Sequence, residues 1–261
     1  MNKSISIYKY CINDLRRSIW IIFYPIFFIL ISFSFIYFTG DISKSIIGTM
    51  NFAILIIPLI SAISGIMYFY NSKEFIQILL AMPIKRSRII FSILAAHSSI
   101  LIISFIAGMI PLMINLSDSE SISGLTQLMI CGLMLTLIYS SISFYFGIIY
   151  EDRIKGFGWT ILFWIITAFL YDGLLLSLIV FFKDYPLERI SIVMSILNPI
   201  DLTRINVLLN FESASILGYT GAVFKEFFGT LTGMSISIFS LILWWLSIIT
   251  LIRFKIRKKD F

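Results

Sequence analysis

The chain has 261 residues, of which 59% are hydrophobic and 13% are charged, whereas a soluble domain has about 45–50% apolar and about 25% charged residues. This composition excludes a soluble globular protein. The formal net charge is +6, but the basic residues flank apolar segments and do not gather with aromatic partners, so the sequence does not indicate nucleic-acid binding.

The N-terminal residues predict a short helix on the membrane surface. Ile5, Tyr8, Ile12 and Leu15 recur at three- and four-residue spacing, with basic residues nearer the other face. Such an elbow helix would lie on the inner leaflet before the first span, and an irregular basic N-terminus is the alternative. The apolar stretch that follows is too long for a signal peptide, so we expect it to be retained as a span.

Six apolar segments are long enough to cross a bilayer as helices. A helix satisfies its own backbone hydrogen bonds in hydrocarbon, and about 20 apolar residues are enough to span it. We therefore expect an all-α membrane protein with a single transmembrane domain over residues 1–261. Its spans are predicted at residues 19–39, 46–70, 89–115, 125–150, 157–182 and 234–252.

The distribution of basic residues predicts the orientation of these spans. Of the 20 Lys and Arg residues, 15 fall in the two termini and in the loops 71–88 and 151–155, which alternation of the spans places on one side. Cytoplasmic loops carry an excess of Lys and Arg. We therefore expect a multi-pass membrane protein with both termini in the cytoplasm; the resemblance described below implies the bacterial inner membrane as its location.

The segment between the second and third spans predicts a short cytoplasmic helix. Asn71 is the expected N-cap, Glu74 follows in the first turn, and Pro83 ends the helix. Its broad apolar face has to be covered, either by the membrane surface or by a groove on a soluble partner. The residues assigned to this helix are Glu74, Phe75, Ile76, Leu79, Leu80, Met82 and Pro83.

Two ionisable side chains fall inside predicted spans. We expect His97 to be a neutral residue hydrogen-bonded to a neighbouring helix, in preference to a metal ligand or a proton relay. A carboxylate such as Asp172 costs about 2.5–3.5 kcal/mol near the bilayer centre. Asp172 is therefore either a protonated or internally hydrogen-bonded structural residue, or a functional point on a conduction path or a subunit interface. Cys131 and Met134 form a soft pair, which helix packing explains better than copper passage.

The sequence lacks the motifs of common enzyme chemistry. It contains no P-loop, no HExxH and no GxSxG, and it has one histidine and two cysteines. We expect a non-catalytic chain that binds no metal and no cofactor itself.

The long segment between the fifth and sixth spans predicts short external helices. Asn198 is a favourable N-cap, Pro199 suits the first helical position, and Asp201 complements the helix dipole in the first turn. We expect the apolar side of this helix to press onto the spans, while Asn198, Pro199, Asp201 and Arg204 form a surface for a periplasmic partner. A second short helix is expected at residues 222–228.

This architecture resembles the type 2 ABC exporter permeases, which share an elbow helix, six spans, a cytoplasmic coupling helix and outer helices before the last span. The coupling helix here ends in LLAMPIKR at residues 79–86. Within that class, four segments resemble the NosY permeases of nitrous oxide reductase maturation: YDG at 171–173, LNPIDLTR at 197–204, LGYTGAVF at 217–224 and FFG at 227–229.

The resemblance implies a homodimer in the inner membrane with two copies of a separate ABC ATPase subunit, which would hold ATP and Mg. It also implies a periplasmic partner of β-helical type and a role in copper-site maturation during denitrification. The expected function is to couple ATP hydrolysis in the partner to transport or mechanical output at the periplasmic face. A type 2 exporter of a drug, a peptide or another small cargo is the alternative, and a membrane scaffold outside the ABC class is a further one.

Overall fold

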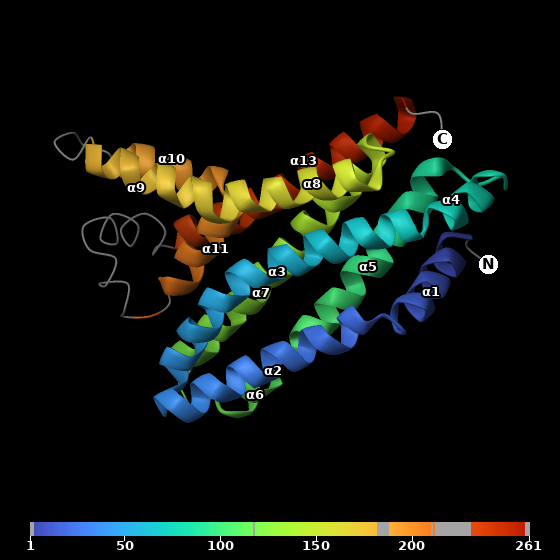
Figure 1. Ribbon diagram of the computed structural model, residues 1–261. Coiled ribbons are helices and arrows are strands. Elements are labelled where there is room, and N and C mark those ends of the chain that lie inside the picture. Colours follow the sequence, from blue (N-terminus) through green and yellow to red (C-terminus); the bar gives the residue numbers. More distant parts are fainter. Residues whose placement is uncertain (1–2, 117, 182–187, 210, 212–230, 259–261) are drawn as a thin grey trace.

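The computed structural model describes residues 3–116, 118–181, 188–209, 211 and 231–258, and every regular element in them is a helix (Figure 1). The expected helix at 222–228 lies outside the described residues. In chain order the elements are α1 (Lys3–Leu15), α2 (Ile19–Thr39), α3 (Ile42–Asn71), α4 (Lys73–Leu80), α5 (Arg86–Gly108), α6 (Ile110–Ile114), α7 (Ser119–Ile149), α8 (Arg153–Ile165), the π-helical turn η1 (Ile166–Leu170), α9 (Tyr171–Phe181), α10 (Glu188–Leu197), α11 (Pro199–Leu208) and α13 (Leu231–Lys258).

Within the described residues, six stretches of helix are long and apolar enough to cross a membrane: α2, α3, α5, α7, the continuous run from α8 through η1 into α9, and α13. They fall on the six predicted segments, so the prediction of six helices able to cross a membrane is confirmed. The chain has the construction of a multi-pass membrane protein.

Two of these stretches are less regular than the sequence predicted. The third span was expected to reach residue 115, but α5 ends at Gly108 and the chain restarts as α6. Pro111 explains the break, because proline has no N–H to continue the helical hydrogen bonds. The fifth span changes from α8 to the π turn η1 before it continues as α9. Such turns widen a helix locally and are frequent at functional sites.

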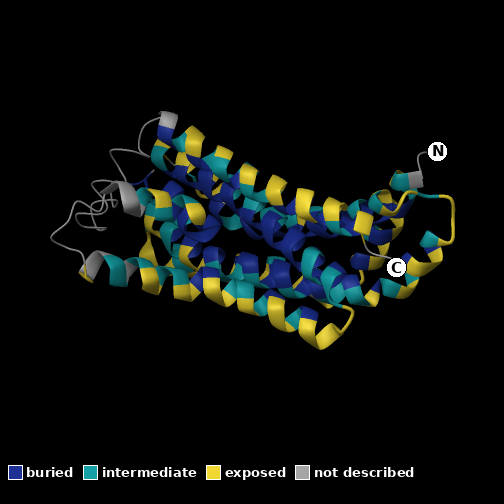
Figure 2. Cartoon of the chain, turned by 90° about the horizontal axis from the view of Figure 1, so that it is seen from above, coloured by how far each residue is buried: buried dark blue, intermediate teal, exposed yellow. Residues whose placement is uncertain are grey.

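The centre of the molecule is the pair α3 and α7, which pack side by side. The most apolar part of each span shows how deeply it is enclosed. In that part, 61% of the residues of α3 and 67% of those of α7 are buried, but only 17% of those of α2 and of the α8–η1–α9 run. Figure 2 shows the same arrangement, with buried residues through the middle and exposed ones on the outer faces. The apolar outer faces of α2 and α8 are therefore the surfaces that lipid would cover.

Small residues allow the central helices to approach each other closely. A Cβ added at Gly65 of α3 would overlap the Ser143 side chain of α7, and one added at Gly132 of α7 would overlap the Phe105 ring of α5. Membrane helices have no hydrophobic driving force between them, so close packing at small residues supplies much of their association.

Helix α1 forms where the sequence predicted it, but the face that it buries along α5 is only partly the expected one. Of the expected residues, Leu15 is buried and Tyr8 and Ile12 are half-buried, but Ile5 is 50% exposed. Ile7 and Cys11, outside the predicted set, are buried as well. The predicted pattern was that of a helix lying on lipid. In the structure the neighbouring helix selects the face, because α5 offers a packed apolar partner on that side.

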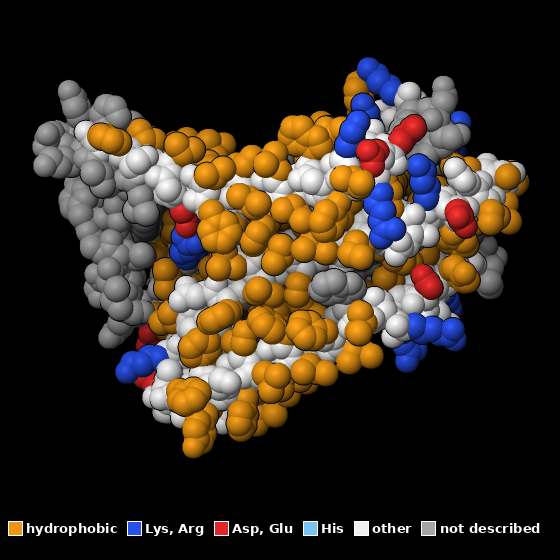
Figure 3. Space-filling view, in the orientation of Figure 1, with side chains coloured by type: hydrophobic (Ala, Val, Ile, Leu, Met, Phe, Trp, Pro, Cys, Tyr) orange, Lys and Arg blue, Asp and Glu red, His pale blue; other side chains and the backbone are white. Residues whose placement is uncertain are grey.

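The two ends of the molecule differ in charge. Helices α1 and α4 and both chain termini lie at one end, and α9, α10 and α11 lie at the other (Figure 1). On the face shown in Figure 3, Lys and Arg side chains gather at the end with the termini, and a broad hydrophobic band separates them from the opposite end. This arrangement is the one that the sequence-based orientation requires.

A pair of glycines on α8 tests whether close packing stabilises the fold. A Cβ at Gly156 would overlap Tyr70 Oη, which donates hydrogen bonds to the backbone oxygens of Tyr150 (2.8 Å) and Asp152 (3.1 Å), whereas a Cβ at Gly158 meets open space. We expect Gly156→Ala to lower the free energy of unfolding by about 1–3 kcal/mol, as overpacking does. Gly158→Ala should be neutral or slightly stabilising because alanine favours helix. Unfolding of the purified protein in SDS measures both, and equal stabilities would contradict this account.

The orientation is tested by cysteine labelling in intact cells, in a background that carries Cys11→Ala and Cys131→Ala. Lys44→Cys at the start of α3 should react with a membrane-impermeant thiol reagent, since the Lys44 side chain is 72% exposed at the end opposite α4. Lys85→Cys, also at an exposed position, should react only after the cells are permeabilised. Labelling of the Lys85→Cys variant in intact cells would contradict the orientation.

Candidate functional site

Three charged side chains meet where the fifth span packs against α11. Arg204 Nη1 donates to Asp172 Oδ2 at 2.7 Å and to Asp201 Oδ1 at 3.4 Å. Asp172 is the second residue of α9, directly after the π turn, and Asp201 and Arg204 are three residues apart on α11. The structure thus joins an aspartate that the sequence placed in a span to two residues that it placed on an external surface.

Asn198 positions α11 for this contact. Its Oδ1 accepts from Ile200 N at 3.1 Å, which caps α11 as the sequence predicted, and its Nδ2 donates to the Thr167 backbone oxygen of η1 at 2.9 Å. The Thr167 hydroxyl is in turn hydrogen-bonded to Tyr139 of α7 at 2.7 Å. One buried amide therefore joins the start of α11 to the irregular part of the fifth span.

The residues expected to form a periplasmic surface do not form an exposed one. Asn198, Pro199 and Asp201 are buried within the chain, and the Arg204 side chain is 32% exposed. The sequence located the start of the helix correctly but not the direction of its polar side. These polar groups turn inward because Asp172 and the Thr167 carbonyl offer them partners there.

The charges of the cluster balance only when one carboxyl group is neutral. Asp201 is 5% exposed, and its Oδ2 receives no hydrogen bond from the described residues. Burial, together with the nearby Asp172 carboxyl group, raises the pKa of Asp201 to about 8, although Arg204 opposes this shift. Near neutral pH the cluster is then one ion pair, between Arg204 and Asp172, beside a protonated Asp201.

The cluster predicts how stability depends on pH. An acid whose pKa is raised in the folded state binds more protons folded than unfolded between its two pKa values, so stability falls as pH rises from about 4 to about 8. Asp201→Asn mimics the neutral carboxyl group, so we expect it to remove much of this fall and to cost little stability at pH 7. SDS unfolding at pH 5, 6.5 and 8 measures the dependence. An unchanged pH dependence in Asp201→Asn would contradict a protonated Asp201.

The other predicted functional element is α4 at the basic end. Ile76 and Leu79, assigned to its partner-binding face, are buried against the chain itself, Leu80 is half-buried, and Phe75 stacks on Tyr10 of α1 with ring centroids 4.8 Å apart. The predicted N-cap, Asn71, is wrong by one residue, because Ser72 occupies that position without a side-chain bond.

The outward side of α4 and the turn after it is formed by other residues. Glu74, Met82 and Pro83 are exposed, as is Ile78, which the sequence analysis did not assign to the helix's functional face. Ile78 is 62% exposed and Met82 is 50% exposed. The hydrophobic pattern alone did not identify this side, because every position on α4 other than Lys73, Glu74 and Gln77 is apolar.

His97 is fully enclosed between central helices. Its Nε2 lies 3.0 Å from Ser64 Oγ of α3, and its ring packs beside Tyr68 and Phe144. This is the bond to a neighbouring helix that the sequence analysis expected. The Ser64 hydroxyl also donates to the backbone oxygen of Ile60, so His97 is placed as a packing and hydrogen-bonding residue between α3 and α5.

No protein-family model matches the chain, and no curated protein is significantly similar to it. The class that the structure itself defines is an all-helical protein with six helices able to cross a membrane.

Proposed function

We propose that the chain is the transmembrane subunit of an ABC transporter complex, built as a homodimer with two copies of a separate ATPase subunit. Within that class we propose a NosY-like role in the inner membrane. The subunit itself is non-catalytic and converts ATP hydrolysis in its partner into transport or mechanical output at the periplasmic face, for copper-site maturation of nitrous oxide reductase with a β-helical periplasmic partner.

The observation that carries the proposal is the outward side of α4. A short helix at the basic end exposes Ile78 and the turn after it exposes Met82, while Ile76 and Leu79 fasten the helix to the rest of the chain. Recognition of a helix in a groove uses outward apolar anchors of this kind. A helix that is packed on one face against the rest of the chain can also transmit movement, because a shift of the bound partner displaces the whole helix.

A rigid connection to the opposite end supports the second half of the proposal. The fifth span is bonded to α11 through Asn198 and through the ion pair of Asp172 with Arg204. Tyr171 Oη also donates to the Met194 oxygen of α10 at 2.6 Å. Displacement of the fifth span would therefore carry α10 and α11 with it.

Two alternatives remain in the proposal. A type 2 exporter of a drug, a peptide or another small cargo would share the ATPase and the coupling helix. Finding genes for an ATPase and a secreted β-helical protein beside this chain's gene would favour the NosY-like role over it. A membrane scaffold outside the ABC class would bind partners without energy coupling, so stable co-purification with an ATPase argues against it.

The experiment is co-purification of the chain from its own cells, with any ABC ATPase subunit that it retains identified and quantified by mass spectrometry. Ile78→Ala with Met82→Ala should release the ATPase, because truncation of a well-buried interface anchor costs about 2 kcal/mol or more of binding. The matched control is Ile103→Ala with Met113→Ala, an exposed isoleucine and methionine on α5 and α6.

The control should retain the ATPase at wild-type stoichiometry. Retention of the ATPase by the Ile78→Ala/Met82→Ala variant would contradict the proposed role of α4, and failure of wild type to bind any ATPase would favour the scaffold.

A further inference from the structure

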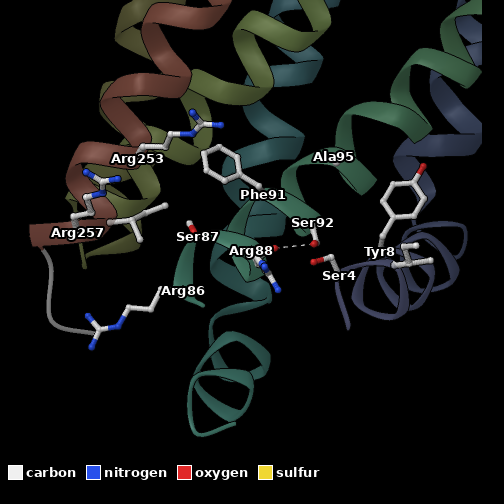
Figure 4. Close-up of a pocket in the computed structure, with 12 residues that line it drawn as sticks. Ser4, Tyr8, Arg86, Ser87, Arg88, Phe91, Ser92, Ala95, Arg253 and Arg257 are labelled. Carbon is white, nitrogen blue, oxygen red and sulfur yellow. Dashed lines mark hydrogen bonds between the residues drawn. The ribbon is translucent and has the colours of Figure 1, made fainter. Parts of the chain in front are cut away.

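A large basic pocket opens at the end of the molecule that carries the termini. It has a volume of about 890 Å³ and lies between α1, the start of α5 and the end of α13 (Figure 4). Four arginines from two helices line it: Arg86 and Arg88 on α5, and Arg253 and Arg257 on α13. This volume is within the range of about 300–1,000 Å³ that ligand pockets occupy.

The charges of three of these arginines are not neutralised by the described residues. No acidic side chain is among the described residues that line it, and within the described residues Arg88, Arg253 and Arg257 have no carboxylate partner. The Arg253 guanidinium lies 5.4 Å from the centre of the Phe91 ring, as Figure 4 shows. Arginine is suited to phosphate, because its planar fork of N–H donors matches two phosphate oxygens.

One wall of the same pocket is apolar and runs along the span. Phe91 and Ala95 lie on α5 five and nine residues beyond Arg86, which at 1.5 Å per residue is about 8 and about 14 Å further along the helix. Ile5 of α1 and Ile256 of α13 add to the apolar lining. The pocket is therefore basic where the spans end and apolar where they continue into the hydrocarbon.

We propose that this pocket binds an anionic phospholipid of the adjoining leaflet, with its phosphate among the arginines and an acyl chain against Phe91 and Ala95. A soluble phosphate compound shares the headgroup chemistry. The lipid is favoured because the pocket lies at the ends of two spans and continues as an apolar wall. Basic pockets between transmembrane helices bind acidic headgroups by the same attraction.

Anchoring of the helix ends at the membrane surface does not by itself explain why these arginines share a pocket with an apolar wall. Arginines at helix ends extend individually to the headgroups, which requires neither a shared cavity nor an adjacent apolar wall. Here arginines from α5 and α13 line one space, where their mutual repulsion is offset once an anion is bound.

The test compares lipid binding to the full purified chain by native mass spectrometry, with phosphatidylglycerol and phosphatidylcholine as probes. Wild type should bind phosphatidylglycerol more tightly. The triple variant Arg88→Gln, Arg253→Gln and Arg257→Gln should weaken that binding on the order of a hundredfold, given the attraction of each basic residue to acidic lipid.

The matched control is Lys73→Gln with Arg153→Gln and Lys155→Gln, which removes the same three charges outside the pocket. This control should bind phosphatidylglycerol like wild type. Equal binding by the triple variant and the control would overturn the site.

Ala95→Trp provides a second variant that keeps every charge. Ala95 is exposed, so a tryptophan can be accommodated there while it fills the path of the acyl chain. It should weaken phosphatidylglycerol binding and leave the thermal stabilisation by inorganic phosphate or glycerophosphoglycerol unchanged. Binding of glycerophosphoglycerol as tight as that of the intact lipid would overturn the lipid assignment in favour of a soluble phosphate compound.

Discussion

Every backbone N–H and C=O group that enters hydrocarbon must find its partner inside the protein, and this constraint underlies the whole structure. Each span meets it alone by being a helix, so that tertiary folding has only to arrange helices that already exist. Because lipid tails are as apolar as the helix surfaces, packing depends on shape. The close approaches at Gly65 with Ser143 and at Gly132 with Phe105 hold α3, α5 and α7 together for this reason.

The same constraint explains why irregular backbone and charge occur together. The π turn η1 interrupts the fifth span, and its Thr167 carbonyl accepts a hydrogen bond from Asn198. One turn further on, Asp172 meets Arg204. A partly buried carboxylate such as Asp172 is stabilised by a charged partner, and a short helix outside the spans supplies that partner. The outer end of the fifth span and α11 thus form one hydrogen-bonded unit.

The opposite end has a different chemistry. There the polar groups are mostly arginines and lysines at helix ends. Some apolar side chains at this end pack α1 and α4 against the spans, and others remain exposed. An outward apolar pair on a fastened helix and the turn after it suits a protein partner, whereas several arginines lining one pocket beside an apolar wall suit a phospholipid. The outward side of α4 and the arginine-lined pocket therefore lie at the same basic end but are proposed to bind different ligands.

Local patterns in the sequence determined the number and position of the spans, the existence of α1 and α4, and the start of α11 at Asn198, because hydropathy, proline and capping act within a few residues. The tertiary structure alone decided which sides of these helices meet. The spans are apolar nearly all round, so periodicity does not indicate which side of a span faces which neighbour. The contact of Asp172 with Arg204 joins residues 32 apart, and the inward turn of Asn198 and Asp201 follows from that contact. For the same reason Ile78, and not Leu79, faces outward on α4. The packing of α5 against that helix decides this, and the sequence of α4 alone does not predict it.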